Sequence, residues 1–331
     1  KSYNNQWGVP LTLARMPKKT KHAVFEVGTN HPGEIAQLSN LVQPHIGIIT
    51  RIAQAHLAGF GSVAAIAREK ASLWAALVDG GTAVYPTDDA AKELLLTQAR
   101  YFGVKNLLGF GHSAGSDVRI LDWETKPGHS YGAFEVLGKR IQITAPVTGM
   151  HWAEVLAAVM AACVVSSVDP QDVADNMGAI LPPEGRGDLI KLPLASGTAL
   201  LMDDSYNANP ASMNAALDTL SRIPATRKLA VLGEMLELGD EAPSLHAALV
   251  WPLQSAGVST VWCIGDLMVN LQQRLPAHRL GQTPTDINTL ALHIYQELAP
   301  GDVILMKGSN GSGVHRICSQ LQQISANNEV K

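Results

Sequence analysis

The stretch "TALLMDDSYNANPASMNAAL", residues 198–217, decides the fold class, because a short apolar run leads through polar residues straight into a helix-like pattern. Residues 198–204 are typical of a strand, and residues 211–223 carry apolar side chains at helical spacing. The junction, residues 203–209, holds two adjacent carboxylates, a hydroxyl, a phenol and two asparagines. In open α/β sheets, ligands lie beyond the carboxyl ends of the strands, at such junctions. The stretch therefore predicts a strand–helix unit with a ligand-facing loop.

Strands and helices alternate in the same way along most of the chain, which predicts parallel sheets covered by helices on both faces. Beyond the opening unit, we expect strands at 22–28, 46–50, 81–86, 228–234, 260–266 and 302–308. We expect helices at 62–78, 90–103, 151–165, 244–257, 290–298 and 314–324, the first of them capped by Ser62.

Residues 117–146 break the pattern, because strand-like stretches follow one another there with short turns between them. We expect a small β-rich insertion at this point. The segment "LPPEGRGD", residues 181–188, is rich in Pro and Gly and marks a domain boundary. The expected fold class is α/β, with one domain at 1–185 and a second at 186–331.

Composition excludes several classes of protein. The chain has 331 residues, 46% of them hydrophobic, which is enough for a large core and two domains. A net charge of −4 favours neither nucleic acid nor an anionic membrane as a partner, and no apolar run reaches the ~20 residues of a membrane span. Three scattered cysteines without CxxC spacing indicate a reducing compartment, so we expect a cytoplasmic protein.

Polar residues gather just after predicted strands. Because parallel strands end at the same edge of a sheet, we expect these clusters to converge on a ligand. The clusters are residues 26–34, 50–62, 203–209, 233–239 and 307–313.

Two of these clusters also have simpler structural explanations. Asp204 alone could cap the following helix, although a cap accounts for one polar residue and not for six together. Residues 307–313, "KGSNGSG", could be a flexible connector. A lysine before Gly and Ser at a helix start also suits a carboxylate or phosphate. Both alternatives stay open on local pattern alone.

Lysine and histidine candidates differ in the strength of their local signal. Lys70 lies beside Arg68 and Glu69 on a predicted helix, and spacing alone favours a solvated helix face. Among eleven histidines, His31 and His56 stand out because each follows a predicted strand next to glycines.

Seven segments together resemble the Mur ligases in order and spacing, over essentially the whole chain. "DSYNANP" followed by "GEMLELG" is the most specific pair. The segments are "KSYNNQWGVPLTLARMP" (1–17), "FEVGTNHPGEI" (25–35), "AHLAGFGSVAAIAREK" (55–70), "GMHW" (149–152), "DDSYNANPASMNAAL" (203–217), "LGEMLELG" (232–239) and "KGSNGSG" (307–313).

The resemblance implies a fold and a reaction. It implies a partial central ATPase-type parallel-sheet domain with the β-rich insertion, followed by a C-terminal Rossmann-like domain. The implied reaction is the ATP-dependent ligation of D-alanyl-D-alanine to UDP-N-acetylmuramoyl-tripeptide through an acyl phosphate, in bacterial cell-wall synthesis. ATP and Mg²⁺ are the implied cofactors, and these two substrates are the implied partners. We expect a monomer.

Metal and catalytic roles follow from the resemblance, residue by residue. Glu26 is similar to a magnesium-ligand glutamate, and His56 to the histidine of a second metal site. Lys70 is similar to a lysine that is carbamoylated in the family and then supports the second magnesium. Carbamoylation requires a neutral amine, so a lowered pKa is implied. The implied catalytic residues are Lys70, His56 and Arg186.

The resemblance also implies binding residues. For ATP these are His151 near the adenine, Arg186 at the domain hinge and Asp204. We expect residues 203–209 to become a wall of the active site when the domains close. Substrate binding is assigned to Asn4, Asn5, Ser205, Tyr206, Asn207, Asn209 and Lys307.

The sequence departs from the family pattern at several positions. Val155 and Pro86 replace residues near the adenine, Asn310 replaces a frequent arginine, and Ala58 a frequent glutamate. No GxxxxGK[ST] motif occurs in the 331 residues, although the family uses one to bind phosphates. We therefore expect the chain to be a truncated form, inactive by itself, of an active parent.

Two other functions remain open at this point. One is another amide ligase of the superfamily, of the folylpolyglutamate or cyanophycin type. The second is a non-catalytic scaffold in cell-wall synthesis. The combination "DSYNANP" and "GEMLELG" disfavours the first, and the retention of Glu26, His56, Lys70 and Asp204 disfavours the second.

Overall fold

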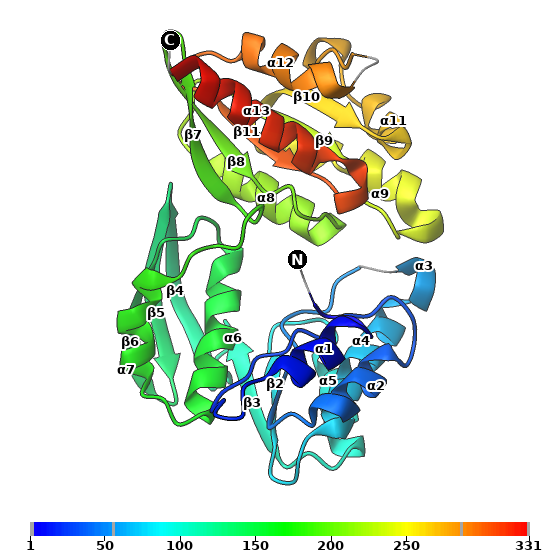
Figure 1. Ribbon diagram of the computed structural model, residues 1–331, viewed down its shortest axis with the longest axis vertical. Helices are drawn as coiled ribbons and strands as arrows, with labels where there is room; N and C mark the ends of the chain where they lie inside the picture. Colours follow the sequence, from blue (N-terminus) through cyan, green and yellow to red (C-terminus); the bar gives the residue numbers. More distant parts are fainter. Residues whose placement is uncertain (1–2, 55–56, 285–286, 330–331) are drawn as a thin grey trace. The chain divides into compact units, whose positions relative to one another are not determined.

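The computed structural model describes residues 3–54, 57–284 and 287–329 (Figure 1). The chain forms two compact units, and the predicted boundary at 185/186 falls inside the second. The first unit comprises residues up to 122 with 133–142 and 153–175, and the second comprises 123–132, 143–152 and the residues from 176 onward.

A six-stranded sheet runs in the order β1-β2-β3-β4-β5-β6. Parallel pairing joins β1 to β2, β2 to β3 and β3 to β4. Two-residue turns separate the last three strands, as in hairpins, so the predicted β-rich insertion is confirmed. The strands are β1 (Ile46–Ile48), β2 (Thr82–Pro86), β3 (Asn106–Gly111), β4 (Val118–Lys126), β5 (His129–Val136) and β6 (Lys139–Ala145).

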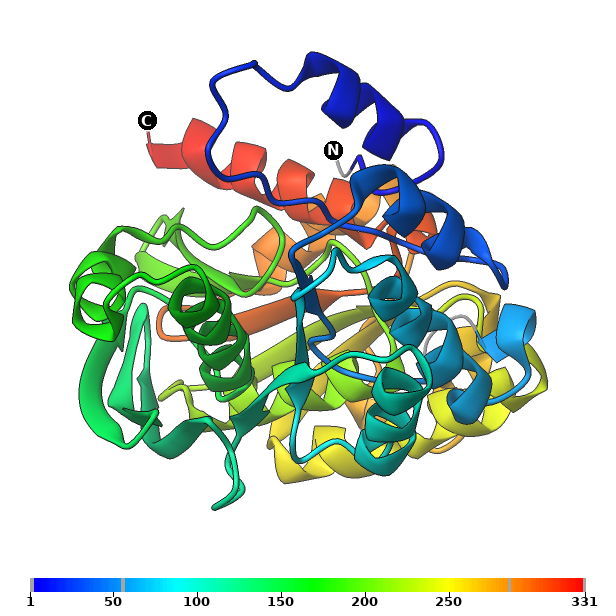
Figure 2. The same cartoon turned by 90° about the horizontal axis from the view of Figure 1, so that it is seen from below.

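In the first 179 residues, two helices form an apolar cluster with strand β2. α4 and α5 lie against each other (Figure 2), and their apolar faces bury Ile66 and Leu95 with Trp74 and Ala83. The α-helices are α1 (Gly8–Arg15), α2 (Glu34–Val42), α3 (Leu57–Phe60), α4 (Val63–Ala71), α5 (Lys92–Tyr101), α6 (His151–Val165) and α7 (Pro170–Asn176). The 3₁₀ helices are η1 (Ser72–Ala76) and η2 (Met177–Ala179).

The second unit contains a five-stranded sheet in the order β10-β9-β11-β8-β7. All neighbours pair in parallel except β7 with β8, which are antiparallel. The strands are β7 (Asp188–Leu194), β8 (Gly197–Asp203), β9 (Lys228–Gly233), β10 (Val258–Ile264) and β11 (Val303–Lys307).

Helices cover both faces of this sheet, as the sequence predicts (Figure 1). Alternate residues of β9 face opposite ways: Ala230 packs with α8, α9 and α10, whereas Val231 packs with α12 and α13. The α-helices are α8 (Pro210–Arg222), α9 (Ala242–Ala248), α10 (Val250–Ser255), α11 (Val269–Gln272), α12 (Ile287–Glu297) and α13 (Val314–Glu329). The 3₁₀ helices are η3 (Gly239–Glu241), η4 (Asp266–Met268), η5 (Ala277–Arg279) and η6 (Asn310–Ser312).

Three predicted elements are wrong in detail. Residues 22–28 form no strand. Gly28 donates one main-chain bond to Asn4, where a strand would need a ladder. The predicted helix at 62–78 changes to 3₁₀ geometry at Ser72, whose hydroxyl bonds to the carbonyl of Glu69. The predicted helix at 244–257 is interrupted at Leu249, because Pro252 has no N–H to continue the helical bonds.

Strand β7 was not among the predicted elements, and it contains Pro193, which has no N–H to donate to a sheet. The structure places β7 at the edge of the sheet, where a missing N–H donor is tolerated. Across the described ranges, no helix is both long enough and apolar enough to cross a membrane.

Candidate active site

Three polar loops meet at one edge of the C-terminal sheet. They follow β8, β11 and β9 and comprise residues 203–209, 307–313 and 233–239. These three strands are parallel neighbours, so their carboxyl ends share an edge, and the predicted convergence of these clusters is confirmed. The predicted cluster at 50–62 does follow a strand, β1, whereas the cluster at 26–34 follows none in the described chain.

Lys307 is the buried anchor of this edge. Its side chain is only 2% exposed, and Nζ lies 2.8 Å from Oδ2 of Asp204. The same ammonium donates to the carbonyl oxygen of Asn207 at 2.9 Å. Burial raises the pKa of the Asp204 carboxyl, while the charge of Lys307 acts in the opposite direction. Lys307 therefore holds the 204–207 turn from beneath and does not face solvent.

Ser309 joins all three loops. Its hydroxyl donates to the carbonyl of Ala208 at 3.3 Å and accepts from the N–H of Leu236 at 2.9 Å. Its own N–H donates to the carbonyl of Glu234 at 3.1 Å. The residue is 3% exposed, so one buried side chain fixes the relative positions of the loops after β8, β9 and β11.

His246 on α9 holds the loop after β9. Its Nε2 accepts from the N–H of Met235 at 2.8 Å, and its Nδ1 lies 2.6 Å from the carbonyl of Ala242. Because that carbonyl can only accept, Nδ1 is the ring nitrogen that donates. Sequence reasoning missed His246, which belongs to no local pattern. It placed Ser309 in the 307–313 cluster without assigning it a role.

The turn at 203–209 is built largely from its own polar groups. Oδ1 of Asp203 accepts from the N–H of Ser205 at 3.1 Å and from its hydroxyl at 2.6 Å. Ser205 is buried, so its hydroxyl points into the protein. Asn209 forms a capping box with Ser212 at the start of α8, so Asn209 is the cap and Asp204 is not. Asn207 is exposed, and its side-chain oxygen accepts from the following N–H.

Arg186 is attached to this turn by its neighbours. Gly187 donates to the carbonyl of Asp203 at 2.7 Å, and the carbonyl of Gly185 accepts from the N–H of Tyr206 at 3.1 Å. The guanidinium of Arg186 lies over the ring of Tyr206, 4.4 Å from its centroid. A cation–π contact thus orients a guanidinium near the Asp204 carboxylate.

Lys70 is partly buried, whereas its spacing suggests a fully solvated helix face. The pKa of its ammonium is lowered, because partial burial removes water from around the charge. The neighbouring Glu69 is also buried and accepts from the N–H groups of Gly33 at 2.8 Å and Ile35 at 2.9 Å. Glu69 on α4 therefore joins this helix to the start of α2.

Asn4 and Glu26 lie together, since Nδ2 of Asn4 donates to Oε1 of Glu26 at 2.9 Å. Asn5 instead accepts from the N–H groups of Trp7 and Gly8 at the start of α1. His56 lies outside the described residues. Within the described ranges, no group of three or more His, Cys, Asp or Glu side chains is arranged to hold a metal ion.

His151 is the first residue of α6, the helix that the sequence predicts at residues 151–165. It follows Gly149, whose φ of +129° favours glycine. A Cβ at Gly149 would lie 2.7 Å from the imidazole, so this glycine leaves room for the ring. Val155, one turn further along α6, is 39% exposed.

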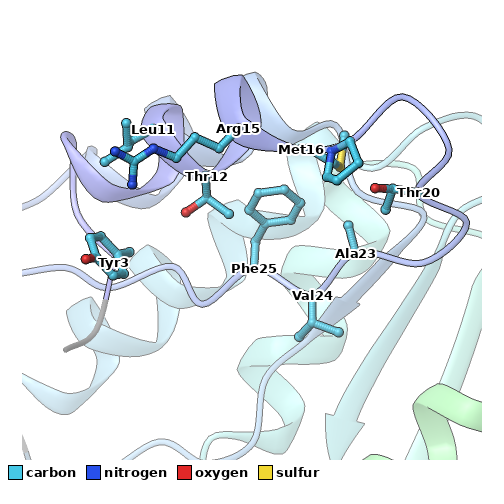
Figure 3. A pocket seen from close by; sticks show the side chains of 10 residues that line it. Tyr3, Leu11, Thr12, Arg15, Met16, Thr20, Ala23, Val24 and Phe25 are labelled. Carbon is cyan, nitrogen blue, oxygen red and sulfur yellow. The ribbon is translucent and has the colours of Figure 1, made fainter.

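A separate pocket lies between α1 and the chain that follows it (Figure 3). Its volume is about 380 Å³, and the ring of Phe25 points toward α1 inside it. The pocket was not predicted and contains none of the predicted site residues. Its lining consists of Tyr3, Leu11, Thr12, Arg15, Met16, Pro17, Thr20, Ala23, Val24 and Phe25.

Comparison with known proteins identifies relatives over nearly the whole chain. The Mur ligase middle domain matches residues 1–163, and the Mur ligase glutamate ligase domain matches residues 185–310. The UDP-N-acetylmuramoyl-tripeptide–D-alanyl-D-alanine ligase of Escherichia coli is 30% identical over 97% of this chain and 69% of its own length.

Solved structures agree with these matches. MurF from Acinetobacter baumannii is 27% identical with a TM-score of 0.86, covering 98% of this chain and 69% of that one. MurF from Thermotoga maritima, solved in complex with ADP, has a TM-score of 0.83 at 22% identity, covering 98% of this chain and 72% of that one. The second likeness concerns the fold alone.

Proposed function

The chain belongs to the Mur ligase family, and from this premise we propose that it serves the ATP-dependent ligation of D-alanyl-D-alanine to UDP-N-acetylmuramoyl-tripeptide. The observation that carries the proposal is the buried network at the edge of the C-terminal sheet. Lys307 and Ser309 tie the "DDSYNAN", "GEMLELG" and "KGSNGSG" loops into one polar surface. A relative named for this reaction matches 97% of the chain, and this supports the choice of substrates.

The chemistry requires two steps. The terminal carboxylate of the tripeptide attacks the γ-phosphorus of ATP, so ADP leaves and an acyl phosphate forms. The free amine of D-alanyl-D-alanine then attacks the acyl carbon, and the tetrahedral intermediate expels phosphate to leave the amide. We propose that the exposed groups of the 203–209 turn, Tyr206 and Asn207, contact the dipeptide, with Asn209 and Ser205 shaping the turn.

Nucleotide binding is proposed for His151, Arg186 and Asp204. The guanidinium of Arg186 offers donors to phosphate oxygens and is already oriented by Tyr206. An ADP complex of a relative with the same fold supports the choice of nucleotide.

Magnesium is proposed as the metal, held by Glu26, His56 and a carbamate of Lys70. Glu26 supplies carboxylate oxygens, and Lys70, whose pKa is lowered by desolvation, can supply carbamate oxygens; both suit a hard cation. Bound there, the metal would offset repulsion between ATP and the substrate carboxylate. Asn4 orients the Glu26 carboxylate, and Asn5 holds the start of α1.

We propose that the protein acts as a monomer in the cytoplasm. The three cysteines, Cys163, Cys263 and Cys318, are unpaired, which supports a reducing compartment.

The test uses the product of the full reading frame that contains these 331 residues. We expect Mg²⁺-dependent release of ADP and formation of the pentapeptide precursor when ATP, UDP-N-acetylmuramoyl-tripeptide and D-alanyl-D-alanine are all present. A substrate panel with tetrahydrofolate plus glutamate and with cyanophycin primers is the control. Turnover with those substrates alone would assign the protein to another amide ligase class. Absence of any ATP turnover would favour the scaffold alternative.

A further inference from the structure

Lys307 combines burial with a complete set of acceptors. Nζ contacts the carboxylate of Asp204 at 2.8 Å and the carbonyl of Asn207 at 2.9 Å, and the carbonyl of Asp204 lies 3.5 Å away. With 2% of its side chain exposed, it presents no free ammonium to a ligand. Lys307 was expected to bind substrate directly. Its ammonium is instead bonded to the turn that carries the candidate site.

We propose that Lys307 is a positioning residue of the ligase site, which acts by fixing the Asp204 carboxylate and the 204–207 turn. The inference rests on the proposed function for its catalytic consequence. Its structural part, the coupling of Lys307 to Asp204, stands independently of that function.

The charges around Asp204 determine what removal of Lys307 does. Lys307 on β11 and Arg186 favour the ionised carboxylate, whereas Asp203 on β8 disfavours it. Burial already raises the pKa of Asp204, so the loss of the strongest favourable charge raises that pKa further. At a given acidic pH, more Asp204 is then protonated, and the turn loses both an anion and its anchor.

The first experiment is a double-mutant cycle on stability, using wild type, Lys307→Met, Asp204→Asn and the double variant in the full protein. We expect Lys307→Met to lower the unfolding midpoint at pH 8, because it leaves a buried carboxylate without its partner. The double variant should be less destabilised than the sum of the single variants. Additive midpoint shifts would overturn the proposed coupling.

The double variant also decides the case in which Lys307→Met does not fold. Recovery of folding in the double variant supports the pair, because replacing both members of a buried pair removes the unpaired charge. Failure of the double variant to fold contradicts the proposal.

The second experiment measures kcat/KM for ATP against pH. We expect the acid limb of the profile in Lys307→Met to move upward by about 1 to 3 pH units. A smaller loss of activity should remain at high pH, because the bond to the Asn207 carbonyl is absent at every pH. A residue that merely held the fold would lower activity equally at every pH, and that result would overturn the positioning role. Lys228→Met is the matched control, because Lys228 begins β9 and its ammonium donates to the carbonyl of Ser221.

The two experiments separate the two proposals. If wild type shows no ligase activity while the midpoints remain non-additive, the proposed function fails and the Lys307–Asp204 coupling stands. If ligase activity is present while the midpoints are additive and the profile does not move, the coupling fails and the function stands.

Discussion

Lys70 is surrounded by an environment that favours its neutral amine. Desolvation lowers the pKa of its ammonium, so a larger fraction is deprotonated near neutral pH than for an exposed lysine. Only the neutral amine reacts with carbon dioxide to form a carbamate. The direction of the pKa shift therefore agrees with the carbamate that we propose as a magnesium ligand.

For Lys70→Ala we expect a loss of ligase activity of about 10- to 100-fold or more, since the residue would support a metal ligand set. Short carboxylic acids should restore part of the activity by supplying the missing oxygens. In wild type, carbon-13 bicarbonate should give a carbamate NMR signal that Lys70→Ala lacks. Lys105→Ala is the control, because Lys105 is exposed. Full activity in Lys70→Ala would contradict the assignment.

The burial of Lys70 is a feature of the site that local sequence does not predict. Local spacing favours a solvated face for Lys70, whereas the structure shows it partly buried. Glu69 beside it reaches the N–H groups of Gly33 and Ile35, more than thirty residues away in sequence. No pattern within one helix predicts such contacts. The resemblance to a family supplied the candidate role of Lys70, and the pKa supports it.

At the scale of the element, α8 depends on its N-terminal cap. Asn209 accepts from the N–H of Ser212, the Ser212 hydroxyl accepts from the N–H of Asn209, and Pro210 begins the helix. For Asn209→Ala we expect a loss of about 1 kcal/mol in the free energy of unfolding, measured by urea denaturation.

Asn214→Ala provides the matched control for the cap, because Asn214 is exposed in the middle of the same helix. Alanine has the higher helix propensity there, so this variant should be unchanged or slightly more stable. Equal losses in the two variants would show that asparagine at 209 is not acting as a cap.

Most elements were predictable from the sequence because their patterns are local. α6 begins and ends where its apolar run predicts, and Ser62 caps α4 as expected. The errors arise where a non-local partner decides the outcome. Residues 22–28 have strand-like composition without a ladder, and β7 forms despite Pro193 because β8 provides a partner.

At the scale of the whole molecule, the C-terminal segment has a core of its own. The buried residues of the two apolar clusters on its sheet all lie between Leu192 and Leu321. One cluster fills each face of the sheet, and neither cluster includes a residue from before position 186. We expect a fragment of residues 186–331 to fold without the rest of the chain.

The measurement is thermal unfolding of this fragment by circular dichroism, together with dispersion of its amide NMR signals. One cooperative transition with well-dispersed signals is the expected result. A fragment that is unfolded, or that melts without cooperativity, would show that its core depends on residues before 186. The fragment carrying Leu305→Ala is a control. Leu305 is fully buried, so its truncation should lower the unfolding midpoint.

Strand order in the C-terminal sheet constrains when the sheet can form during synthesis on the ribosome. β11 is the last of its strands in sequence, yet it lies between β9 and β8. The β7–β8 hairpin can pair as soon as it emerges, because its contacts are local. β8 and β9 must instead wait, with unpaired edges, until residues 303–307 leave the exit tunnel. A nascent chain stalled before Val303 should therefore be a target for chaperones that bind exposed strand edges.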